Sequence, residues 1–163
     1  MARAVLMTGG NRGDMHGRLA EALHLLGERA GRITAVSGIY RSAAWGFEAD
    51  DFYNQAVELE TALEPLELLD TVQEIERLSG RDRTAEKAEK EASGARYASR
   101  TLDIDILFYD DLVLESERLT IPHPRIAERM FVLEPLCEID PDRVHPLTGK
   151  TIKEMRIQLG IRN

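Results

Sequence analysis

Six periodic segments follow one another in the order strand, helix, strand, strand, helix, strand, and this order constrains the fold more than any other feature. Leu19, Leu23 and Leu26 recur at helical spacing, whereas Val57, Leu59 and Thr61 alternate with charged residues as in a strand. The order is that of a ferredoxin-like α+β sandwich, an antiparallel sheet with helices on one face and the other face open for a ligand. The expected strands span residues 2–8, 33–41, 52–61 and 102–109.

Local signals mark where the two helices begin and end. Asp14 is a candidate N-cap for the first helix, and Gly31 follows that helix as a stop signal. Thr61 and Glu64 have the spacing of a capping box for the second helix, which we expect to end at Gly80. The tract 84–95, rich in Ala, Glu and Lys, has no apolar stripe and is expected to be a mobile excursion.

The C-terminal third is expected to add a hairpin and helices to this core. We expect the hairpin over 112–121, a short helix around 131–136 and a terminal helix over 151–159. No internal repeat or linker divides the chain, so residues 1–163 are interpreted as one domain. A chain of 163 residues is long enough to bury its own core.

Composition excludes several classes of function. The net charge of -8 argues against a sequence-independent nucleic-acid binder and against docking to an acidic membrane surface. The apolar run at the start is too short for a signal peptide or a spanning helix, so we expect a cytoplasmic protein. We also expect a monomer whose partners are small molecules.

Two aspartates at alternate positions, Asp103 and Asp105, interrupt an otherwise apolar expected strand. Leu102, Ile104 and Ile106 can enter a core on one face while both carboxylates point to the other. Neighbouring like charges repel, and a divalent cation between them removes that cost. The alternative is that both aspartates lie on the wet face of an edge strand.

Arginines flank the aspartate strand in a chain that is otherwise acidic. Guanidinium groups match phosphate oxygens, so this cluster together with a carboxylate pair suits a metal-bound polyphosphate. The alternative is surface pairing with nearby glutamates. The sequence also lacks a Walker loop, which favours arginines and metal as the phosphate ligands. The arginines are Arg81, Arg83, Arg96 and Arg100.

Further candidates lie outside this cluster. His123 stands between two prolines and close to Arg118 and Thr120, which suggests another phosphate contact, although a lone histidine can be purely structural. Phe52, which precedes Asn54 at a strand entrance, and Phe131 are either core residues or a stacking site for a flat heteroaromatic ligand. Gln73 and Glu76 lie at the edge of the expected apolar helix stripe, and by themselves they are interpreted as solvated flanking residues rather than ligand contacts.

These residues together give the chain a family resemblance. The segment Arg100-Thr101-Leu102-Asp103-Ile104-Asp105-Ile106 resembles the diagnostic pattern of the 6-hydroxymethyl-7,8-dihydropterin pyrophosphokinase family of folate biosynthesis. Supporting segments are Gly9 with Asn11, Tyr40-Arg41, Asn54, Gln73 with Glu76, Gly80-Arg81-Asp82-Arg83, Arg118 to His123, and Arg129 with Phe131. The resemblance covers essentially the whole chain.

The resemblance implies the ferredoxin-like α+β fold and an ATP-dependent diphosphotransferase. The β,γ-pyrophosphoryl group of ATP would pass to 6-hydroxymethyl-7,8-dihydropterin, with AMP as the other product. Asp103 and Asp105 would hold two Mg²⁺ ions. Arg81, Arg83 and Arg100 would act in catalysis. The ATP contacts would be Gln73, Glu76, Arg96, Ile106, Arg118, Thr120 and His123, and the pterin contacts would be Ser42, Ala43, Trp45, Phe52, Asn54 and Phe131.

The chain departs from the family pattern in places. Ser42-Ala43-Ala44 replaces a common Thr-Pro-Pro, which loosens the loop, and Tyr97 stands where many members have Trp. Two other classes of function remain open from the residues alone. One is a different metal-dependent nucleotide enzyme, which would release ADP or free pyrophosphate. The other is a non-catalytic ligand-binding or RNA-binding module, in which Asp103→Asn would be harmless.

Overall fold

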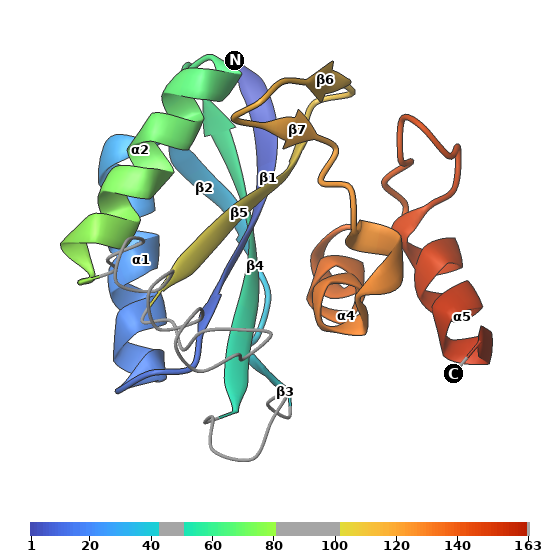
Figure 1. Cartoon of the computed structure of the whole chain (residues 1–163), viewed down its shortest axis with the longest axis horizontal. Coiled ribbons are helices and arrows are strands. Elements are labelled where there is room, and N and C mark those ends of the chain that lie inside the picture. The colour runs from blue at the N-terminus through green and yellow to red at the C-terminus, as the bar shows by residue number, and fades with distance from the viewer. Residues whose placement is uncertain (43–50, 81–101, 163) are drawn as a thin grey trace.

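The molecule is built on an antiparallel sheet with helices on both sides (Figure 1). The structure is a computed structural model that describes residues 1–42, 51–80 and 102–162. The sheet strands are β1 (Ala2–Gly10), β2 (Arg32–Val36), β3 (Tyr40–Ser42), β4 (Phe52–Thr61) and β5 (Asp103–Tyr109). The helices are α1 (Met15–Arg29), α2 (Pro65–Leu78), α4 (Met130–Ile139) and α5 (Ile152–Arg162). The strand order is β2-β4-β1-β5, and β3 also pairs with β4. With β2 and β3 counted as one interrupted strand, this is the expected ferredoxin-like arrangement.

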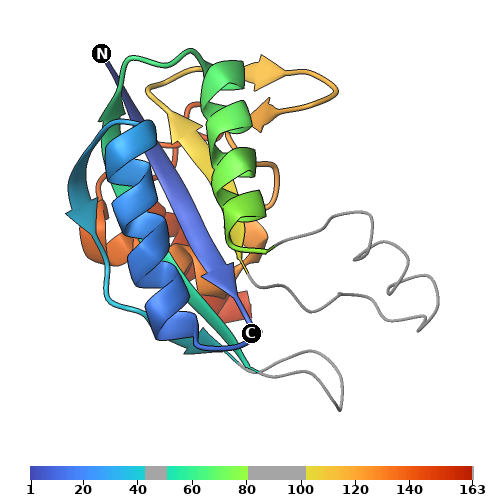
Figure 2. The same cartoon turned by 90° about the vertical axis from the view of Figure 1, so that its left-hand side faces the viewer.

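Helices α1 and α2 cover one face of the sheet, as the sequence predicts. Figure 2 shows them side by side across β1. Leu6 and Leu59 from the sheet pack with Leu19 of α1 and Val72 of α2, and all four are fully buried. Removing apolar side chains from water is the main stabilising term here, so this face forms the principal core.

One of the two expected helix caps is confirmed. The Asp14 carboxylate accepts a hydrogen bond from the Gly17 amide at 3.2 Å and caps α1. The predicted capping box of α2 was placed one turn too early, because the pair is Glu64 and Glu67. The Thr61 hydroxyl instead donates to the Ala30 carbonyl at 2.6 Å, which ties the end of β4 to the end of α1.

The strand expected over 33–41 is divided into β2 and β3. The Ser37 hydroxyl oxygen accepts from the Ala56 amide at 2.9 Å, in the place of a regular ladder bond. The Gln55 amide nitrogen donates to the Ser37 carbonyl at 2.8 Å. The break is therefore fixed to β4 by side-chain hydrogen bonds, which a pattern of alternating residues does not reveal.

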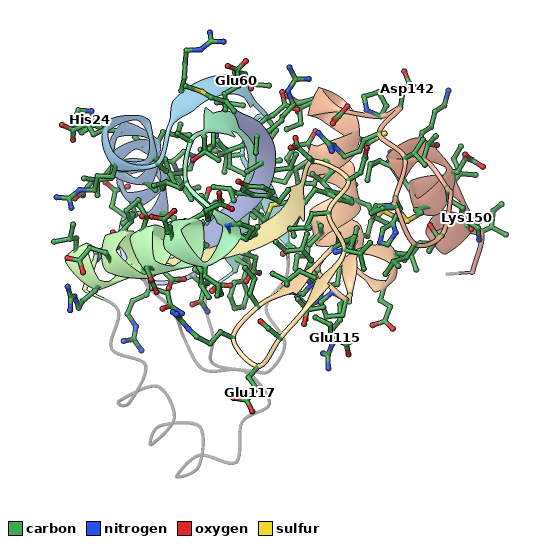
Figure 3. All side chains as sticks on the ribbon, turned by 90° about the horizontal axis from the view of Figure 1, so that it is seen from above. His24, Glu60, Glu115, Glu117, Asp142 and Lys150 are labelled. Carbon is green, nitrogen blue, oxygen red and sulfur yellow. The ribbon has the colours of Figure 1, made fainter. Side chains whose placement is uncertain are left out.

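The second face of the sheet is covered in part, which corrects the expectation that it is open throughout. Helix α4 contacts β3 and β4, and α5 packs on α4 (Figure 1). Val5 and Phe108 from the sheet form a second apolar cluster with Leu133, Leu136 and Met155. Seen from above in Figure 3, His24 on α1 and Lys150 near α5 lie at opposite ends of the molecule, with the sheet between them.

A bulge in β5 supplies this second cluster. Leu6 lies opposite Ile106 and Val5 opposite Phe108, so Leu107 is an extra residue on β5. Strict alternation would turn Phe108 to the face of Ile106. With the bulge, Leu107 and Phe108 both enter the second cluster while Ile106 stays in the first.

The C-terminal additions agree with the sequence expectation. Strands β6 (Leu114–Glu115) and β7 (Thr120–Ile121) form the hairpin, and Glu117 lies in the loop between them (Figure 3). A short 3-10 turn, η1 (Ile126–Glu128), precedes α4. Within the described ranges, every helix is too short or too polar to cross a membrane. The tract 84–95 lies outside those ranges.

Candidate active site

A row of four residues crosses the second face of the sheet, one from each of four strands. Tyr40 lies opposite Asn54, Asn54 opposite Gly9, and Gly9 opposite Asp103. Residues that lie opposite each other in antiparallel strands project to the same face. The row therefore aligns a phenol, an amide and a carboxylate, with a glycine between the last two.

Gly9 leaves the row without a side chain between Asn54 and Asp103. A methyl group at this position would collide with the Asn54 Oδ1 atom and come within 2.9 Å of the Tyr53 carbonyl oxygen. Asn54 is nine-tenths buried, so its side chain has little room to retreat. A larger residue at position 9 would displace the amide, and glycine is the residue that allows this close approach.

Asp103 and Asp105 point away from the principal core, as predicted from the alternation. Leu102, Ile104 and Ile106 all belong to the cluster beneath α1 and α2, while both aspartates are half-buried on the opposite face. Across β1, Asp105 lies opposite Met7 and Asp103 opposite Gly9.

The donor set of this pair suits a hard divalent cation. Mg²⁺ takes oxygen ligands, commonly from one or two carboxylates with water and phosphate oxygens completing the shell. In the described part of the chain, no group of three or more His, Cys, Asp or Glu side chains forms a metal site by itself. Two carboxylates therefore fit a cation that shares its coordination with a phosphorylated substrate.

Glu76 is a buried contact of β5 and not a solvated flanking residue. Its side chain is 1% exposed, and its Oε2 atom accepts a hydrogen bond from the Ile104 amide at 2.8 Å. That amide lies between the two aspartates on the outer edge of the sheet. Helix α2 is thus joined directly to the backbone that positions both carboxylates.

His123 lies along the same edge. Its backbone amide donates to the Leu107 carbonyl at 3.0 Å, and its Nδ1 atom accepts from the Arg125 amide at 3.2 Å. Because Nδ1 is an acceptor, the proton of the neutral ring is assigned to Nε2. Burial is the largest cause that lowers the pKa of His123, and Arg129 lowers it further, while the nearby Asp103 carboxylate raises it. The ring is therefore neutral at pH 7 and placed to donate a hydrogen bond.

The other described nucleotide candidates lie on the α2 side of β5. The Arg118 guanidinium contacts the Asp70 carboxylate at 2.5 Å and the Gln73 side-chain oxygen at 3.4 Å. Thr120, two residues after Arg118, is half-buried in β7. The Ile106 side chain is 3% exposed within the principal core, so only its backbone is available to a ligand.

One aromatic candidate lies beside β3 and the other at the start of α4. Phe52 is half-buried, lies opposite Ser42, and shares the face of Asn54 two residues on. Phe131, on the first turn of α4, remains 38% exposed, and the Arg129 guanidinium lies 5.6 Å from its ring centre. An exposed aromatic ring beside a cation is unlike a core residue and offers a surface for a flat ligand.

Six predicted site residues fall outside the described part of the chain. They comprise four arginines of the phosphate cluster and two residues of the 43–50 segment: Arg81, Arg83, Arg96, Arg100, Ala43 and Trp45.

Comparison with known proteins gives a consistent result. Residues 5–141 match the family described as 7,8-dihydro-6-hydroxymethylpterin-pyrophosphokinase (HPPK). The chain is 42% identical over 153 residues to a 2-amino-4-hydroxy-6-hydroxymethyldihydropteridine pyrophosphokinase of Synechocystis sp., covering 93% of this chain and 73% of that protein. It is 39% identical to the enzyme of the same name from Methylorubrum extorquens, covering 98% and 94% of the two chains.

Solved structures agree on the fold. The crystal structure of Plasmodium falciparum HPPK-DHPS, wild type with pteroate, superposes with a TM-score of 0.77 at 17% identity. The alignment covers 99% of this chain but 45% of the Plasmodium chain, so this chain spans less than half of that protein. At this identity the likeness concerns the fold alone.

Proposed function

The chain belongs to the 7,8-dihydro-6-hydroxymethylpterin-pyrophosphokinase family, and on that premise we propose that its site transfers the β,γ-pyrophosphoryl group of ATP to 6-hydroxymethyl-7,8-dihydropterin. The products are AMP and 6-hydroxymethyl-7,8-dihydropterin diphosphate. Family membership carries the reaction class, pyrophosphoryl transfer in folate biosynthesis.

The row across the second face is the observation that supports this assignment to particular residues. Its Asp103 end suits a metal-bound phosphate chain, and its Asn54 end, flanked by Phe52, suits a flat heterocycle with an amide edge. Gly9 separates the two ends. A hydroxymethyl group on the heterocycle would thus face the phosphate chain across a position without a side chain.

The aspartate pair is proposed to hold two Mg²⁺ ions on the triphosphate. When bound, these ions neutralise charge on the phosphate oxygens and help to align the leaving group. Asp103 and Asp105 supply the carboxylate oxygens, and the Glu76 bond to the intervening amide keeps their backbone in place.

The remaining contacts of ATP are proposed to come from the outer edge of β5 and from the α2 side of that strand. Neutral His123 donates from Nε2 to a phosphate oxygen, and Arg118 exchanges Asp70 for a phosphate. Gln73, Thr120 and the Ile106 backbone lie toward the nucleoside. Arg96 completes this set, and Arg81, Arg83 and Arg100 neutralise charge that develops during transfer.

The pterin is proposed to stack between Phe52 and Phe131. Asn54 reads its amide edge, since one side chain supplies both a donor and an acceptor. Ser42 with Ala43 and Trp45 adds hydrogen bonds from the backbone. The transfer is direct and forms no covalent enzyme intermediate. Holding both substrates in line therefore supplies much of the rate enhancement.

In the transfer itself, the hydroxymethyl oxygen forms a bond to the β-phosphorus of ATP. The bond from that phosphorus to the oxygen shared with the α-phosphorus breaks, and AMP leaves with both electrons. The hydroxyl proton is released to water.

The enzyme is proposed to act as one domain over 1–163, as a monomer in the cytoplasm.

An assay of the products tests this function. The purified protein is incubated with ATP, Mg²⁺ and 6-hydroxymethyl-7,8-dihydropterin, and the nucleotides and pterins are separated and identified by mass. We expect AMP and the pterin diphosphate in equal amounts. Stoichiometric release of ADP or of free pyrophosphate would overturn the proposal, and a reaction without added pterin serves as the blank.

A further inference from the structure

Glu138 on α4 uses both of its carboxylate oxygens to hold the break between β2 and β3. Oε2 accepts from the Gly38 amide at 3.0 Å, and Oε1 accepts from the Tyr40 hydroxyl at 2.6 Å. The second bond is the largest cause that raises the pKa of Tyr40 to about 12, so the phenol stays a donor at any physiological pH. Charge-assisted bonds of this kind are short and strong.

The break held by Glu138 is also attached to β4. On its other side, Ser37 exchanges hydrogen bonds with Gln55 and Ala56 of that strand. Segment 37–40 is thus fixed between the sheet and α4, and Tyr40, its last residue, lies opposite Asn54 in the row described above.

The same face of α4 carries Phe131. Residues 131, 134 and 138 are spaced by three and four, so they form one stripe along the helix. Glu138 bonds to Tyr40, and the charge of Glu134 also raises the pKa of Tyr40, so the Glu134–Glu138 part of the stripe faces β3. Phe131 lies seven residues from Glu138, about 10 Å along the helix axis.

We propose that Glu138 is a positioning residue for the heterocycle-binding side of the site, which it serves by fixing the spacing between α4 and β3–β4. Phe131 belongs to the first element, and Phe52 and Asn54 belong to the second. The bidentate contact of Glu138 joins them. This inference rests on the proposed function, because it takes the ligand between the two elements to be the pterin.

Glu138 suits this role because its removal leaves the packing of α4 intact. The helix is anchored by buried Val132, Leu133 and Leu136, whereas Glu138 is exposed. Loss of the carboxylate is therefore expected to let the distance between α4 and β3–β4 vary, without unfolding the helix.

The test compares Glu138→Ala, Glu138→Gln and Tyr40→Phe with the wild type. Glu138→Ala removes both charge-assisted bonds, and we expect it to raise KM for the pterin about tenfold, with KM for ATP within about twofold of the wild type. In Glu138→Gln the amide oxygen can still accept from the Gly38 amide and the amide nitrogen can donate to the Tyr40 hydroxyl oxygen, so this variant is expected to restore most of the affinity. Tyr40→Phe removes one bond and is expected to have an intermediate effect.

Glu134→Gln is the matched control. It removes a carboxylate from the same stripe, and within the described residues Glu134 acts on Tyr40 through its charge alone. Its kinetic constants are expected to match those of the wild type. Equal losses of pterin and ATP affinity in a folded Glu138→Ala protein would overturn the inference, as would an unchanged KM for the pterin.

Hydrogen exchange separates this inference from the proposed function. The Gly38 amide is expected to exchange faster in Glu138→Ala than in the wild type, whatever the enzyme binds. If the wild type forms no pterin diphosphate, the proposed function fails and the positioning role fails with it. If the wild type is active and the exchange of Gly38 is unchanged in the variant, only the positioning role is overturned.

Discussion

The two faces of the sheet are built for different purposes. Under α1 and α2 the sheet face is lined mainly by buried apolar residues, among them Leu6, Leu59 and Ile104. Under α4 only part of the face is apolar, and the remainder carries the row that ends at Asp103. One sheet thus provides a dry core and a polar surface from alternate residues of the same strands.

This difference shows how half-buried acids can be kept in a stable domain. The free energy that stabilises β1, β4 and β5 comes mainly from the α1 and α2 face, where large residues are fully buried. The other face can then carry charged groups that add little apolar burial, such as two neighbouring carboxylates. Substitutions on the two faces should therefore separate stability from activity.

The largest expected effect belongs to the aspartate pair. We expect Asp103→Asn and Asp105→Asn each to lower kcat about 10³-fold, since a carboxylate-held cation contributes several kcal/mol to transition-state stabilisation. The free energy of unfolding should change much less than the activation free energy, because Asn is nearly isosteric with Asp. Steady-state kinetics and urea unfolding measure the two quantities. Near-normal kcat in both variants would remove the chemical role assigned to this face.

A core substitution on the other face should give the reverse result. Leu19 of α1 is fully buried. We expect Leu19→Ala to lower the free energy of unfolding by about 2–5 kcal/mol while kcat of the folded protein changes little. Urea unfolding and an assay below the unfolding transition check this. A large loss of kcat in the folded variant would show that the two faces are not independent.

Two glycines allow a smaller and matched comparison. Gly9→Ala places a methyl group against Asn54, so we expect a loss of about 1–3 kcal/mol in stability and a raised KM for the pterin. Gly27 lies in α1, and a methyl group there would meet its nearest neighbour, Ile33 Cδ1, at 3.8 Å. Gly27→Ala should stabilise the protein by about 0.5–1 kcal/mol and leave the KM unchanged. Similar effects at both positions would contradict the special place of Gly9.

The smallest expected effect is on the pH dependence of stability. The pKa of His123 is lowered in the folded protein. At pH values between the folded and unfolded pKa, the unfolded chain therefore binds a proton that the folded chain does not. Stability should therefore fall as the pH drops from about 6.5, the ordinary pKa of histidine, toward the lower folded value. His123→Gln should reduce this slope in urea unfolding measured at several pH values. His145, whose pKa is also lowered by burial, should account for part of the slope that remains. An identical slope in the wild type and His123→Gln would contradict the assignment.

The sequence predicts what depends on local periodicity. Alternation in the 102–106 segment places Asp103 and Asp105 opposite the core, and helical spacing locates α1, α2 and α4 within a few residues. These features follow from which residues are apolar, and that information is present in each segment by itself.

Features that depend on distant partners could not be predicted. The strand over 33–41 is interrupted because Ser37 bonds to Ala56 and Gln55, far along the chain. Glu76 resembles a solvated flanking residue until β5 supplies the Ile104 amide. Glu138 has no sequence signal that distinguishes it from other charged helix residues. In each case the deciding contact is made only once the fold has formed.

The outer edge of β5 has a further consequence. An edge strand presents amide and carbonyl groups that can recruit a strand from another molecule. Here the Glu76 carboxylate takes the Ile104 amide, and the His123 amide takes the Leu107 carbonyl. The two acids can thus occupy the outermost strand, while that strand offers other chains fewer amide and carbonyl groups with which to pair.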